Sequence, residues 1–118
     1  MKAILIDAAK RQVSEVNISG DYRDINKHIG CEIFTIGYSL KGRDAVFVDD
    51  EGLFNNENTF FTFEGAHQPF AGNGLICGSD KDGETTDCKI DIDEVKSKVQ
   101  FYDRNTLAMA MAFGKVKY

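Results

Sequence analysis

The chain has 118 residues, of which 42% are hydrophobic and 28% are charged, and its formal net charge is −5. This length suits one domain with one hydrophobic core, and the composition excludes a chain that is disordered over most of its length. The negative charge argues against nucleic acid as a ligand, because binding to phosphates needs clustered Lys and Arg side chains.

The chain begins with a pattern typical of two strands and a helix. Residues 1–8, which are mostly apolar, and 11–18, which end in alternating apolar and polar side chains, predict two strands joined by a turn. In residues 21–30 the spacing changes to that of a helix, with Asp21 as the N-cap and Gly30 at the C-terminal end. We therefore expect a hairpin followed by a short helix.

Residues 31–40 alternate more regularly than any other segment and predict a strand. The apolar side chains expected on one of its faces are Phe34, Ile36, Tyr38 and Leu40. A turn separates this strand from the apolar strand at 45–48, so the two are expected to form a hairpin. Residues 59–63 and 75–78 predict two further strands, the second of them buried.

The C-terminal part predicts two helices. Residues 91–102 have apolar side chains at helical spacing, namely Ile92, Val95, Val99 and Tyr102. Residues 105–118 alternate like a strand, but their alanines and methionines favour a helix capped by Asn105 or Thr106 and ended by Gly114. The expected fold is a single α+β domain at 1–102, with a mostly antiparallel sheet and two or three short helices packed on it. Residues 103–118 form an extension of that domain.

Charge is distributed unevenly along the chain. Residues 44–94 carry thirteen acidic and two basic side chains, whereas residues 1–43 and 95–118 have net charges of +2 and +4. Such an acidic segment is either a solvated face or a recognition surface for a basic partner. The candidate residues for binding a partner are Asp49, Asp50, Glu51, Asp80, Asp82 and Glu84.

Neither acidic loop fits the pattern of a calcium-binding EF-hand. With Gly52 as the sixth residue of the loop, the first position is apolar and the twelfth is Asn58; with Gly83 as the sixth, the twelfth is Lys89. Three consecutive carboxylates beside a glycine are expected to stay hydrated, which is a poor setting for acid–base catalysis. We therefore predict no catalytic residue, no cofactor and no metal.

One segment offers an alternative with a small ligand. The glycines of residues 72–78 have the spacing G-x-G-x-x-x-G, which differs by one residue from the dinucleotide-binding fingerprint. A small-molecule or nucleotide-binding, or hydrolytic, domain that uses the turn at Asn73–Gly78 is the alternative to a protein-binding domain.

The cysteines and histidines give little indication of chemistry. Cys31, Cys77 and Cys88 form no C-x-x-C pair, and Cys77 is interpreted as a small buried hydrophobic residue. A nucleophilic pair between His67 and either Cys77 or Cys88 is an alternative that the sequence cannot test. With no signal peptide or membrane span expected, the protein is predicted to be cytoplasmic.

Several stretches, taken in order, resemble a small family of uncharacterised domains carried mainly by bacteriophages, prophages and plasmids. The matching stretches are MKAILID, INKHIGCEIFTI, AVFVDDEGLFNNEN, FAGNGLICGSDKDGE and DIDEVKSKVQFY. The resemblance covers residues 1–102, and this sequence departs from the family pattern after Glu51. It implies an accessory gene of a mobile element, of the kind carried near counter-defence genes, and it implies no established activity.

Together, these patterns favour a non-enzymatic accessory protein of a phage or plasmid. It is expected to bind a host protein with a basic surface through the acidic segment, without contacting nucleic acid or a membrane. A third hypothesis is a homo-oligomer, in which the apolar alternation at 107–113 forms the interface.

Overall fold

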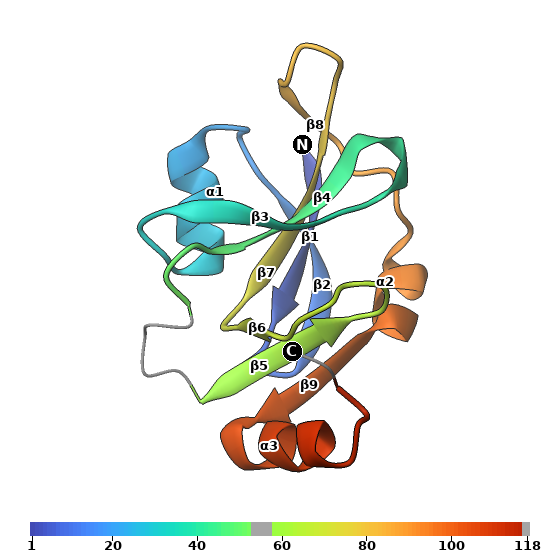
Figure 1. Ribbon diagram of the computed structural model, residues 1–118. Helices are drawn as coiled ribbons and strands as arrows, with labels where there is room; N and C mark the ends of the chain where they lie inside the picture. Colours follow the sequence, from blue (N-terminus) through green and yellow to red (C-terminus); the bar gives the residue numbers. More distant parts are fainter. Residues whose placement is uncertain (53–57, 117–118) are drawn as a thin grey trace.

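The computed structural model describes residues 1–52 and 58–116. It has an α+β fold of mostly antiparallel strands with three short helices, as the sequence predicts (Figure 1). The strands are β1 (Lys2–Asp7), β2 (Gln12–Asn17), β3 (Phe34–Ser39), β4 (Asp44–Asp49), β5 (Thr59–Phe63), β6 (Phe70–Ala71), β7 (Gly74–Ser79), β8 (Thr85–Thr86) and β9 (Val99–Asp103). The helices are α1 (Tyr22–Ile29), α2 (Ile92–Lys98) and α3 (Arg104–Ala112), with a 3-10 turn at Lys41–Arg43.

The strands form two antiparallel sheets. The larger sheet has the order β2-β1-β7-β4-β3, and β8 pairs with the end of β7. The hairpins β1–β2 and β3–β4 confirm the pairings expected from the sequence. The smaller sheet has the order β6-β5-β9 and lies between the larger sheet and α3 (Figure 1). Strand β7 is therefore central, and β2 and β3 are the two edges of the larger sheet.

Three strands were not predicted, and one of them corrects a predicted helix. The helix expected over 91–102 ends at Lys98, and residues 99–103 form β9, which pairs with β5 from Val99↔Phe63 to Asp103↔Thr59. Val99 and its aromatic neighbours suit a strand, and pairing with β5 overrides the helical spacing. The other two, β6 and β8, are two-residue strands in segments for which the sequence predicts no strand.

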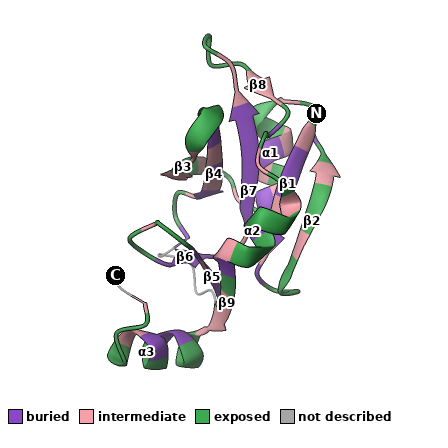
Figure 2. Cartoon of the chain, turned by 90° about the vertical axis from the view of Figure 1, so that its right-hand side faces the viewer, coloured by how far each residue is buried: buried purple, intermediate pink, exposed green. Residues whose placement is uncertain are grey.

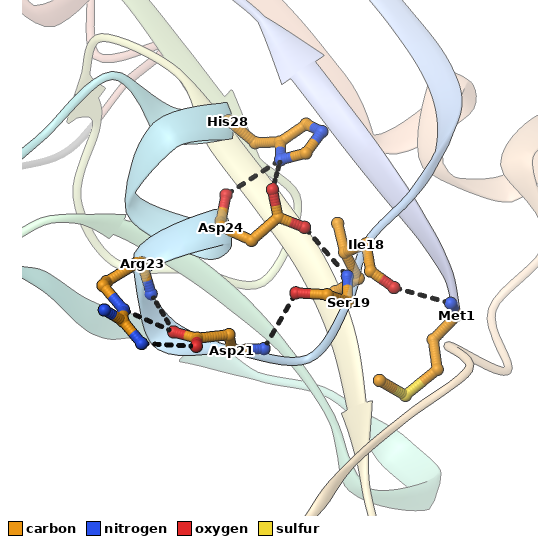
Figure 3. Close-up of polar contacts among 7 residues, drawn as sticks. All are labelled: Met1, Ile18, Ser19, Asp21, Arg23, Asp24 and His28. Atoms are coloured by element: carbon orange, nitrogen blue, oxygen red, sulfur yellow. Dashed lines mark hydrogen bonds and ion pairs between the residues drawn. The ribbon is translucent and has the colours of Figure 1, made fainter.

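Helix α1 has the two ends that the sequence predicts. The Asp21 carboxylate caps the helix by accepting from the backbone N–H of Arg23 at 2.8 Å, and it also pairs with the Arg23 guanidinium (Figure 3). The hydrogen bonds from Arg23 hold the pKa of Asp21 below its ordinary value. Gly30 adopts φ 84° at the C-terminal end, a conformation that glycine tolerates best.

The larger sheet is covered on both faces, which explains its buried strands. On one face Ala3, Leu75 and Cys77 contact α1 through Ile25 and Ile29. On the other face lies the inner core, which joins the larger sheet to the smaller sheet and α2. The buried residues of the inner core are Ile4, Ile6, Val46, Val48, Phe61, Phe63, Phe70, Ile76, Cys88, Val95 and Val99. Alternate residues of β1, β4 and β7 thus enter two different cores.

Strand β3 does not keep its apolar side chains on one face, so that expectation was wrong. Its pairing with β4 shifts by one residue between Ile36 and Tyr38, which is a β-bulge. As a result Phe34 packs with the α1 side of the sheet, whereas Tyr38 packs on the inner core. Gly37 sits at the shift, where an added Cβ would lie 2.8 Å from the Phe70 ring. Ile36, just before the bulge, is exposed.

Candidate functional site

The six acidic candidate residues do not form one surface. Strand β4 pairs with β7 so that Val48 lies opposite Gly74 and Asp44 lies opposite Gly78. Asp49–Glu51 therefore follow the end of β4 next to the start of β7, whereas Asp80–Glu84 follow the end of β7. The two groups lie at opposite ends of the central strands (Figure 1).

The first group forms a turn anchored by its own backbone. The Asp49 carboxylate accepts from the backbone N–H of Glu51 at 2.9 Å, and Asp50 N–H donates to the carbonyl of Ile33 at 2.9 Å. The side chains of Asp50 and Glu51 are exposed. The continuation of this loop, at 53–57, lies outside the described residues. Two acids of this group are thus available to a partner.

The second group is a hairpin tip in which Asp80 has a structural role. Its Oδ1 atom accepts from the backbone N–H of Asp82 at 2.9 Å and from that of Glu84 at 3.0 Å. Positive charge lies nearby: Lys81 is in the same turn, and the Arg43 guanidinium donates to the Asp80 carbonyl at 3.4 Å. This group is therefore less uniformly acidic than the first.

The first acidic group lies beside exposed apolar side chains, which the sequence analysis missed. Ile33 and Ile36 are 58% and 56% exposed; Ile33 directly precedes edge strand β3, and Ile36 lies in the middle of that strand. Glu32 is also exposed, and residues 31–40 and 44–52 contain no Lys or Arg. The regular alternation of 31–40 does not reveal this exposure, because alternation does not show which part of a strand other elements cover.

The opposite edge of the larger sheet, strand β2, differs from β3 in the polarity of its exposed side chains. Strand β2 exposes only polar or charged side chains, and its exposed residues are Gln12, Ser14, Glu15 and Asn17. Polar and charged edges are one means by which proteins prevent unwanted strand pairing. The β3 edge lacks this protection at Ile33 and Ile36, although its bulge interrupts the edge after Ile36.

A cleft of about 460 Å³ lies between the 3-10 turn, β5 and α2. Tyr38, Leu40, Phe63 and Ile90 supply its apolar lining. Two of its three lysines have partners: Lys98 Nζ lies 3.8 Å from Glu94 and 3.9 Å from Glu64, and Lys89 Nζ donates to the Gly42 carbonyl. The third, Lys41, also lines the cleft, so the lining combines lysines with glutamates and indicates no single class of ligand.

The segment Asn73–Gly78 is not the turn that the nucleotide-binding alternative assumed. Residues 74–78 lie in β7, the central strand, and all five are buried. An added Cβ at Gly74 would lie 2.6 Å from the Phe61 ring, so aromatic packing occupies the space that a phosphate would need. The Asn73 side chain accepts from the Ala8 backbone at 2.9 Å, which links two strands. The glycines of β7 therefore allow neighbouring groups to pack closely against this strand.

The thiols are poorly suited to nucleophilic chemistry. Burial raises the pKa of the Cys77 thiol to about 12, and it raises the pKa of Cys88 as well. Burial, together with the Asp49 charge, raises the pKa of Cys31 to about 11. All three are therefore protonated near neutral pH, and a protonated thiol is a weak nucleophile. Cys77 is 1% exposed, which confirms its interpretation as a buried residue.

The two histidines lie on different elements. His28 Nδ1 donates to the Asp24 carbonyl at 2.9 Å and lies 3.4 Å from the Asp24 carboxylate, both on α1 (Figure 3). The same carboxylate accepts from Ser19 N–H, so it ties the start of α1 to the end of β2. His67 is exposed on the loop between β5 and β6.

The described residues contain no group of three or more His, Cys, Asp or Glu side chains arranged to hold a metal ion. Within the same residues, no helix is long and apolar enough to cross a membrane.

Comparisons with known proteins identify a family. Neither the curated proteins nor the solved structures include a significant match to this chain. A family model described as "Domain of unknown function (DUF3846)" matches residues 1–100. This match spans both sheets and α2 up to the start of β9. The chain therefore belongs to the DUF3846 family of domains of unknown function.

Proposed function

We propose that this chain is a non-enzymatic binding domain that engages another protein through one end of the larger sheet. The proposed site, the β3 edge surface, consists of Glu32, Ile33, Ile36, Asp50 and Glu51. The observation that carries the proposal is the exposure of Ile33 and Ile36, at 58% and 56%, just before and within an edge strand that exposed acids flank.

The chemistry of this surface favours an extended basic segment with apolar side chains. An edge strand offers backbone N–H and C=O groups that can pair with an added strand. The bulge after Ile36 confines such pairing to the first half of β3. Ile33 and Ile36 would contact apolar side chains of the partner, and Glu32, Asp50 and Glu51 would attract its Lys or Arg residues.

Two parts of the proposal depend on the sequence resemblance alone. These are the origin of the gene in a phage or plasmid and the identity of the partner as a host protein in the bacterial cytoplasm. The structure adds to them a specific surface, and it favours the first acidic group over the second, where Lys81 and Arg43 lie close to the acids.

A binding experiment with two charge-matched variants tests the proposal. Proteins that bind the wild-type chain are captured from a lysate of the bacterium that carries the gene, and the affinity of each purified candidate is measured by calorimetry. Asp50→Asn with Glu51→Gln removes two acids from the β3 edge surface, and Asp82→Asn with Glu84→Gln removes two from the other end of the sheet. A third variant, Ile36→Thr, removes apolar area.

The first and third variants should each raise Kd roughly tenfold, which corresponds to about 1.4 kcal/mol, and added salt should weaken wild-type binding. The Asp82/Glu84 variant should bind like the wild type. Equal affinities for all four proteins, or no bound protein at all, would count against the β3 edge surface. A partner lost only with the Asp82/Glu84 variant would place binding at the other end of the sheet.

A further inference from the structure

From Leu107 onward, helix α3 is apolar on both of its sides, which is unusual for a helix at the surface. Residues 105–114 contain no Asp, Glu, Lys, Arg or His. On the inner side Leu107 and Ala110 are buried, and Leu107 packs with Phe60 and Ala71 of the smaller sheet. A surface helix ordinarily has polar or charged residues on its other side.

The other side of α3 is instead apolar and exposed. Met109 and Phe113 are 60% and 73% exposed, and their spacing of four residues places them next to each other on the helix. Ala108 and Ala112 are exposed beside them. These four residues are the outer face of α3, and they lie at the end of the molecule opposite β8 (Figure 2). A helix with two apolar sides is normally covered on both.

We propose that a second copy of this chain covers the outer face of α3, in a two-fold symmetric pair of antiparallel helices. In such a pair the same face of each copy meets the other, so any charge on the face would meet a like charge nearby. The outer face of α3 carries no charge, whereas the chain as a whole has a net charge of −5 and the β3 edge surface carries acids. Of these two exposed apolar surfaces, α3 is the one that can meet its own copy without repulsion.

The shape and polarity of α3 also fit this arrangement. Ala108 and Ala112 are small, so two helices can approach closely while Met109 and Phe113 fill the space on either side. An antiparallel pair places the positive end of each helix dipole beside the negative end of the other. Asp103 caps the N-terminus in a capping box with Thr106, so this helix end is already satisfied within the chain.

Sedimentation of the full chain over a concentration series tests the inference. The wild type should change from monomer to dimer as its concentration rises, and Met109→Glu with Phe113→Glu should raise the dissociation constant at least roughly tenfold. The matched control, Ile33→Glu with Ile36→Glu, adds the same charge to the other exposed apolar pair and should dimerise like the wild type. Circular dichroism checks that each variant is folded.

A mixing experiment separates a lost interface from a damaged fold. Met109→Lys with Phe113→Lys should also be monomeric alone, and an equal mixture with the Glu variant should form a heterodimer, because opposite charges then meet across the interface. A wild type that stays monomeric throughout the series would overturn the inference, whatever the variants do. Dimerisation that survives the α3 variants but is lost in the Ile33/Ile36 control would overturn it as well.

Discussion

Asp44 belongs to the acidic segment, but its side chain is buried and has a structural role. It is 2% exposed, and among the described residues it is the buried charged side chain. Its carboxylate accepts from the backbone N–H of Lys89 at 2.8 Å and from that of Ile90 at 2.8 Å. These bonds attach the segment before α2 to the start of β4. The acidic segment therefore combines structural acids, such as Asp44 and Asp80, with the exposed acids Asp50 and Glu51.

Replacing Asp44 with Asn should be destabilising, because the amide offers one oxygen acceptor and places an N–H₂ group where the carboxylate now meets backbone donors. We expect Asp44→Asn to lower the free energy of unfolding by about 1–3 kcal/mol, measured by urea denaturation. Asp82→Asn, at an exposed position, is the matched control and should change the free energy by less than about 0.5 kcal/mol. Equal effects of the two substitutions would show that the Asp44 contacts contribute little.

At the scale of elements, the sequence predicts what depends on neighbours along the chain. The β1–β2 hairpin, α1 with its caps at Asp21 and Gly30, and the β3–β4 hairpin all follow from local alternation, turns and capping. Helix α3 was also predicted, although its N-cap is Asp103 and not Asn105 or Thr106. The hydrogen bonds of the cap hold the pKa of Asp103 below its ordinary value.

The elements that could not be predicted depend on contacts between distant segments. Residues 99–103 continue the helical spacing of α2, and only their pairing with β5 makes them a strand. The bulge at Gly37 depends on the partner strand, so the position of Tyr38 and Leu40 on the inner core could not be inferred from 31–40 alone. For the same reason the separation of the acidic residues into two groups required the strand order. That order places β7 between β1 and β4.

A substitution at Gly74 tests whether the glycines of β7 are needed for close packing of neighbouring side chains against this strand. An added Cβ would lie 2.6 Å from Phe61 Cζ, on a ring that is fully buried and has little room to move. Gly74→Ala should therefore lower the free energy of unfolding by about 1–3 kcal/mol, measured by urea denaturation. In a Phe61→Leu background, where Cζ is absent, the same substitution should cost less. An equal cost in both backgrounds would refute direct contact with the ring as the cause.

At the scale of the whole molecule, the two sheets share one core and α3 lies outside it. Alternate residues of β5 divide between two clusters: Phe61 and Phe63 enter the inner core, whereas Phe60 packs with Ala71 and Leu107 beneath α3. The inner core joins β1, β4 and β7 to β5, β6 and α2, so these elements should unfold together. None of its buried members lies in α3. This arrangement favours the predicted division between a domain and a C-terminal extension, which is still a prediction.

Deleting residues 104–118 tests that division, and the cut leaves Asp103 paired with Thr59 in the smaller sheet. The shortened chain loses the burial of Leu107 and exposes Phe60, so its free energy of unfolding should fall by roughly 2–5 kcal/mol. It should still unfold in one cooperative transition, and the amides of β1 and β7 should stay protected from hydrogen exchange, because the inner core is intact. Leu107→Ala in the full chain is the control and should cost about 2–3 kcal/mol without changing that protection. If the deletion abolishes the cooperative transition or the protection of β1 and β7, α3 is part of the folding unit and the extension is not separable from the domain.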